Sequence, residues 1–98
     1  MNEPTHIGIR GGDGRVFCNL PILRNITLRG ISGFCIHQYE DEFRVSHVET
    51  GSYLTRAGTD GEAFTQARRF DRVELESKIT ATRRELKNLG QLQERGVK

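Results

Sequence analysis

Long apolar runs are missing from this sequence. No stretch approaches the roughly 18 consecutive apolar residues that a membrane-spanning helix needs. The opening residues Met1–Thr5 also lack the basic and then apolar build of a secretory signal. We therefore expect a cytoplasmic protein that has no membrane partner.

Cysteine is scarce, and the two that occur, Cys18 and Cys35, are too few for a disulfide framework. In a reducing compartment such residues usually behave as small buried apolar side chains. Cys35, His37 and His47 would offer three metal ligands, but the hairpin expected here places His47 on the opposite face. No fourth ligand follows at metal spacing, so we expect no metal site and no cofactor.

Catalytic motifs are also lacking. No nucleophile motif accompanies the three histidines, His6, His37 and His47. The acids at Glu40–Glu42 have the character of a solvated turn. The glycines of Gly11–Gly14 have an expected strand on both sides, whereas a phosphate-binding loop joins a strand to a helix. We expect no enzymatic activity.

The chain has 98 residues, a length that suits one domain over 1–98. We divide it into a β-rich part at 1–58, a helix at 59–89 and a flexible tail at 90–98. The predicted fold is α+β, a small antiparallel sheet of four or five short strands followed by one long C-terminal helix. Six segments are candidates for these strands: 6–10, 15–18, 26–31, 34–39, 43–48 and 53–56. The segment 26–31 is the weakest of them, and Pro21 lies in a connection or an edge.

The strongest strand pattern lies at 34–39 and 43–48. A two-residue turn at Asp41 and Glu42 would make Gln38 face Val45 and Ile36 face His47. One face of this hairpin is then apolar. The other is a more polar mixture that water could cover, made of Cys35, His37, Tyr39, Arg44, Ser46 and Val48.

The apolar period lengthens to nearly four after Gly58. Thr59 and Glu62 have the spacing of a capping box, which predicts a helix start, and nothing interrupts the pattern until Gly90. A helix over 60–89 would be about 45 Å long. Its apolar sector rotates past Arg72, so we expect the helix either to bend near 70–74 or to offer a second stripe to another surface.

That second stripe has the spacing of a coiled-coil seam over about two heptads. We expect the small sheet to leave it uncovered, as a partner-binding surface or a homodimer contact. Its members are Leu75, Ile79, Thr82, Leu86 and Leu89.

Net charge is only +2, far below the basicity of dedicated nucleic-acid binders. The whole excess follows Gly58, where nine Lys and Arg oppose seven acids. We expect a basic helix face with Glu76 in its middle, which is either solvated or contacts phosphate or an acidic protein. Its members are Arg68, Arg69, Arg72, Arg83, Arg84 and Lys87.

The segment Gly58–Ala63 resembles the strand-to-helix joint of small nucleic-acid-binding modules, such as double-stranded-RNA-binding domains and the arm-binding domains of phage integrases. The RNA-binding modules place a lysine pair where this chain has Asp60 and Gly61, so the resemblance does not extend to a phosphate contact there. The sequence of the segment Phe43–Gly51 resembles segments of short phage and prophage proteins.

These patterns lead to two hypotheses. The first is a non-catalytic protein-binding module, an accessory or inhibitor protein of a phage or mobile element that acts on a host protein or nucleoprotein complex, for example in an anti-defence or anti-CRISPR role. The alternative is direct nucleic-acid binding through the basic face of the helix.

Overall fold

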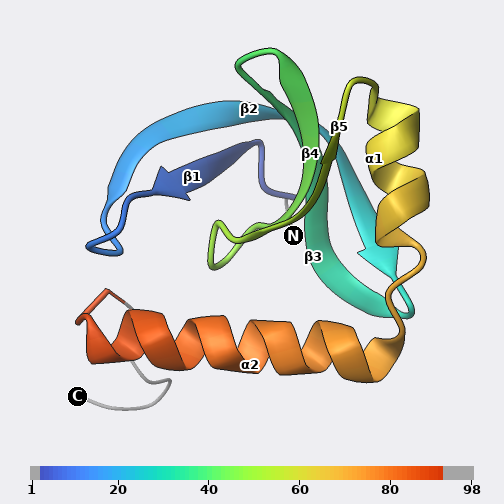
Figure 1. Cartoon of the computed structure of the whole chain (residues 1–98). Helices are drawn as coiled ribbons and strands as arrows, with labels where there is room; N and C mark the ends of the chain where they lie inside the picture. Colours follow the sequence, from blue (N-terminus) through green and yellow to red (C-terminus); the bar gives the residue numbers. More distant parts are fainter. Residues whose placement is uncertain (1–2, 92–98) are drawn as a thin grey trace.

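The structure is a computed structural model that describes residues 3–91. Five antiparallel strands pair in chain order, and two helices follow them (Figure 1). The elements are β1 (His6–Arg10), β2 (Val16–Leu28), β3 (Ile31–Tyr39), β4 (Glu42–His47), β5 (Tyr53–Ala57), α1 (Asp60–Ala67) and α2 (Arg72–Asn88). The α+β class with an antiparallel sheet is confirmed. Most of the tail expected at 90–98 lies outside the described residues.

The prediction of one long helix is wrong, because the chain leaves the helix after Ala67 and begins a new one at Arg72. Asp71 is the N-cap of α2: its carboxylate accepts a hydrogen bond from the Glu74 amide at 2.8 Å, and the Glu74 carboxylate accepts one from the Asp71 amide at 2.9 Å. This reciprocal pair is a capping box, which stabilises a new helix start. The expected bend near 70–74 is therefore a break between two helices. At α1 only half of the predicted capping box forms: the Thr59 hydroxyl accepts from the Glu62 amide at 3.1 Å, but the Glu62 carboxylate accepts from that hydroxyl, at 3.2 Å, and not from the Thr59 amide.

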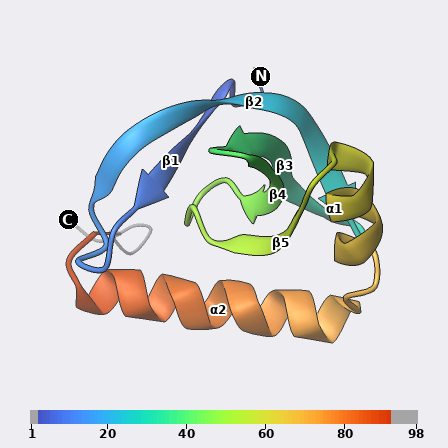
Figure 2. The same cartoon turned by 45° about the horizontal axis from the view of Figure 1, so that its top comes forward.

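β2 is the longest strand and replaces the separate segments expected at 15–18 and 26–31. Its first half pairs with β1 as far as Pro21, and its second half pairs with β3 from Ile22 onward. Pro21 has no N–H, and it lies where β2 changes partner, so no ladder bond is broken there. Figure 2 shows the result: β2 arches over β3 and β4 and carries β1 across to the other side of the sheet.

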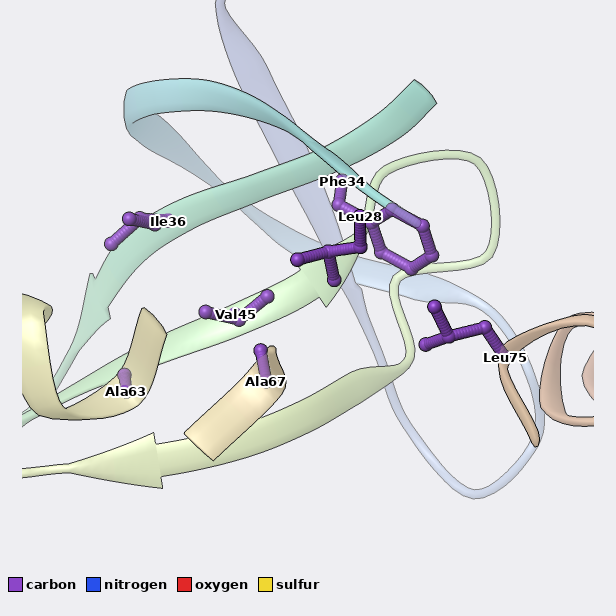
Figure 3. Packing of buried hydrophobic residues seen from close by; sticks show 7 residues of the cluster. All are labelled: Leu28, Phe34, Ile36, Val45, Ala63, Ala67 and Leu75. Atoms are coloured by element: carbon purple, nitrogen blue, oxygen red, sulfur yellow. The ribbon is translucent and has the colours of Figure 1, made fainter. Parts of the chain in front are cut away.

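One face of the sheet packs against both helices (Figure 3). Phe34, Ile36 and Val45 project from the strands, Ala63 and Ala67 come from α1, and Leu75 comes from α2. All of them are buried. The predicted apolar face of the hairpin is therefore the main core of the protein.

The opposite face is not covered by water, as the sequence suggested, but by β1. Ile7 and Ile9 of β1 bury Cys35 and the neighbouring side chains of His37 and Ser46 in a second core. The two polar groups are paired with each other, since His37 Nε2 lies 2.8 Å from Ser46 Oγ. Hydrogen bonding is what makes the burial of such groups tolerable.

The β3–β4 turn lies one residue earlier than predicted. Tyr39 pairs with Glu42, so Glu40 and Asp41 form the two-residue turn and Glu40 adopts a positive φ of 56°. Ile36 consequently faces Val45 rather than His47. The pairing has moved by two positions, and because side chains alternate with a period of two, every residue keeps its predicted face.

Candidate anion-binding groove

The apolar stripe of α2 faces the protein's own sheet. Leu75 is 0 % exposed and Leu86 is 5 % exposed, while Ile79 is half-buried and packs against the main core. Thr82 is also half-buried, and only Leu89 retains substantial exposure, at 43 %. The prediction that the sheet leaves this stripe uncovered is wrong. The reason is that α2 lies along the curled sheet from the β2–β3 turn to the β1–β2 hairpin (Figure 1).

The predicted basic face is divided between two elements. Arg68 and Arg69 belong to the turn after α1, so they no longer share a helical face with the basic residues of α2. Two arginines of α2 have carboxylate partners: Arg72 Nε lies 3.1 Å from Glu76, and Arg83 Nε lies 2.7 Å from Glu49. Arg84 and Lys87 lie on the exposed part of the same helix. The six residues therefore do not form one helical face.

Arg68 and Arg69 instead join residues of β2 to line an open groove of about 440 Å³. The groove lies between the end of β2 and α1. Three arginines and two threonines line it, and none of its described lining residues is acidic. The lining comprises Thr27, Leu28, Arg29, Phe64, Thr65, Arg68 and Arg69.

Arg29 holds the two sides of this groove together. It occupies a tight turn with Gly30 in which both residues have positive φ, 50° and 79°, the geometry of a type I′ hairpin turn. Its guanidinium donates hydrogen bonds to the carbonyl oxygens of Phe70 and Arg68, each at 2.9 Å. In return its own carbonyl accepts from Arg72 at 3.1 Å. The β2–β3 turn is thus tied to the junction between α1 and α2.

Phe64 forms an apolar wall of the groove, and two arginines lie beside its ring. The guanidinium carbon of Arg24 lies 5.2 Å from the centre of its ring, and that of Arg68 lies 5.7 Å from it. Both distances are within cation–π range. The contacts orient two positive groups beside the groove without neutralising them. Arg24, Arg29, Arg68 and Arg69 therefore concentrate positive charge at one corner of the molecule.

The histidines and cysteines considered for metal binding or catalysis lie elsewhere. Burial lowers the pKa of His37 and of His47, and it raises the pKa of Cys35 to about 12, so the imidazoles and the thiol are neutral near pH 7. His47 lies on the face of the sheet opposite Cys35 and His37, with its Nδ1 3.0 Å from the Thr50 hydroxyl. Over residues 3–91 no three His, Cys, Asp or Glu side chains gather into a metal-binding group.

Comparisons with family models, curated proteins and solved structures returned no match to this chain. Within the described residues, neither helix has the length and apolar character needed to cross a bilayer. The groove must therefore be interpreted from its own chemistry.

Sequence reasoning found Arg68 and Arg69 but missed Arg24, Arg29 and the two threonines of the groove. The expected strand at 26–31 ran through the Arg29–Gly30 turn, although an Arg-Gly step between two apolar segments is compatible with a hairpin. The Asp71 and Glu74 spacing was a further available signal, because it matches a capping box and separates Arg69 from α2.

Proposed function

We propose that this protein binds nucleic acid by holding backbone phosphates in the arginine groove. The observation that carries the proposal is the groove's lining, which combines three arginines and two threonines with no acidic residue among those described. Guanidinium groups bind phosphate oxygens in a bidentate geometry, and hydroxyl groups are common secondary donors to the backbone. Contacts of this kind position a nucleic acid without reading its sequence.

The overall charge of +2 is compatible with such binding if the contact is small. Affinity from phosphate contacts falls with salt by a slope of about 0.9 per phosphate neutralised on duplex DNA. A groove with three arginines at its lining would contact about three phosphates on this scale. We therefore expect weak binding that is lost near physiological salt unless a second contact adds to it.

Fluorescence anisotropy with labelled DNA and RNA tests the proposal. We would titrate duplexes of about 20 base pairs and matching single strands at low salt, where phosphate contacts are strongest. The test variant is Arg68→Glu with Arg69→Glu, two exposed residues of the groove. The matched control is Arg15→Glu with Arg84→Glu, which changes net charge by the same amount at exposed positions outside the groove.

The expected result is a loss of affinity of about 100-fold or more in the groove variant and a much smaller loss in the control. Equal losses would show that binding responds to net charge alone. Absence of binding to every probe at low salt would reject the proposal and favour an acidic surface on a host protein or nucleoprotein complex, which the same arginines would suit.

A further inference from the structure

A second, separate cleft lies on the other side of the Arg29–Gly30 turn from the arginine groove. It occupies about 600 Å³ between the β2–β3 turn and the outer edge of α2. Its polar lining residues are Ser32, His47, Arg72, Glu76, Thr80 and Arg83. Arg29, Arg68 and Arg69 do not line it, so its chemistry is independent of the nucleic-acid proposal.

His47 is the most buried polar residue of this cleft, at 6 % exposure. Its ring is held by the hydrogen bond between Nδ1 and the Thr50 hydroxyl and by packing against Phe34, whose ring centre is 5.3 Å away. Among residues 3–91 Nε2 has no hydrogen-bond partner, and it is not among the fully buried unsatisfied atoms, so it keeps some exposure. Because His47 lines the cleft, this nitrogen is the ring atom left to bind a ligand there.

Two guanidinium groups line the same cleft and keep donors available. Arg72 uses Nε toward Glu76 and Nη1 toward the Arg29 carbonyl, and Arg83 uses Nε and Nη2 toward a single oxygen of Glu49. Each guanidinium group carries five N–H donors, so both retain unused ones. In both ion pairs the arginine side chain is more than half exposed. Replacing its carboxylate partner by another anion should therefore cost little free energy.

We propose that this cleft binds a small oxyanion, the phosphate or carboxylate group of a small molecule. Arg83 would bind its oxygens from α2, the hydroxyl groups of Ser32 and Thr80 would donate from the two sides, and Nε2 of His47 would donate from the floor. Arg72 begins α2 eleven positions earlier, roughly 16 Å along the helix axis, so it would add positive charge at the other end of the cleft. A guanidinium group, hydroxyl groups and a buried imidazole are donors suited to an oxyanion.

Nuclear magnetic resonance of the histidine side chains provides the test. We would add inorganic phosphate, or succinate in a parallel titration, at constant ionic strength with chloride as the reference ion. His47 is the reporter, and His37 is an internal control because its Nε2 is bound to Ser46 outside the cleft. We expect a saturating shift of the His47 signals and no comparable shift at His37. The anion that gives this saturation, phosphate or succinate or both, identifies the oxyanion that the cleft prefers.

Substitutions then separate a built site from a general charge effect. Arg83→Gln should weaken the His47 response at least about fivefold, whereas Arg84→Gln, at the next position but outside the cleft, should leave it unchanged. Glu76→Gln should strengthen binding about two- to fivefold, since it removes the one carboxylate among the described residues that line the cleft. This gain also serves as the test if Arg83→Gln fails to fold.

Three results would overturn the proposal. One is a His47 response no larger than that of His37 for both anions. Another is a response that chloride reproduces. The third is binding that is unchanged in both Arg83→Gln and Glu76→Gln.

Discussion

The apolar face of α2 is covered by the rest of the chain, whereas the arginine groove beside the start of α2 is left open. Leu75 is fully buried against the sheet, whereas Arg68 and Arg69, only a few positions earlier, are exposed at the edge of an open groove. The leucines hold the fold together, and the arginines are available to a partner. The difference teaches that an apolar stripe on a helix identifies a docking surface only after the curvature of the neighbouring sheet is known.

The largest effect is expected from Leu75→Ala, which separates the two regions by stability. Removing a fully buried leucine side chain should lower the free energy of unfolding by about 2–5 kcal/mol, the range for such core truncations. Leu89→Ala, at a side chain with 43 % exposure, should cost less than about 1 kcal/mol. Urea denaturation measures both. Under conditions where Leu75→Ala remains folded, its nucleic-acid affinity should not change. Equal losses of stability in Leu75→Ala and Leu89→Ala would contradict the assignment of the stripe to the core.

A substitution at Gly51 should disturb the packing of β1 over the second core, and we expect it to have the next largest effect on stability. Gly51 has a φ of 73°, and a Cβ atom there would collide with the carbonyl oxygen of Gly8 in β1. Gly51→Ala should therefore cost about 1–3 kcal/mol, since both the backbone conformation and the contact oppose a side chain. Gly12→Ala is the control, because a Cβ there meets no atom within 4 Å. Thermal denaturation showing the same loss in both variants would reject this account of how β1 is held over the second core.

Lowering the pH should have the smallest effect on stability, and it separates the buried histidines from the arginine groove. Burial lowers the pKa of His37 and of His47 in the folded protein, so the unfolded chain takes up protons first as the pH falls below about 6.5. Their contribution to stability is present above that pH and is lost as the pH falls through the folded-state pKa values. Urea denaturation at pH 7.5 and pH 5 should show this decline, and the decline should be smaller in His37→Gln than in the parent protein. Neither His37 nor His47 lines the groove, so the affinity of the folded protein for nucleic acid should stay constant.

The sequence predicted the local pairing of this fold better than its closure. The alternation in β3 and β4 assigned Phe34, Ile36 and Val45 to the core even though the turn was misplaced, because an error of two positions preserves the face. The sequence could not show that β1 would cover Cys35, because this packing depends on how far β2 curves beyond Pro21. The hidden stripe of α2 was mistaken for a docking surface for the same reason.

The candidate site was predicted only in part. Arg68 and Arg69 were identified from their charge, but Arg29 reaches Arg68 from the β2–β3 turn, and Arg24 of β2 reaches Phe64, both from some forty positions earlier in the chain. A contact of such sequence separation leaves no periodic signal in a single sequence. The pairing of Arg83 with Glu49, across 34 positions, is hidden in the same way, so the sequence could not distinguish paired from available arginines.

The salt dependence of nucleic-acid affinity tests the central claim most directly, because its slope counts the phosphates that the groove contacts. We predict that replacing Arg68 and Arg69 together with glutamine lowers the slope of log affinity against log salt by about 1.8 on duplex DNA, at about 0.9 for each contact. The same replacement of Arg15 and Arg84 should leave the slope unchanged. A slope that is identical in the parent protein and in the groove variant would contradict the assignment of phosphate binding to this groove.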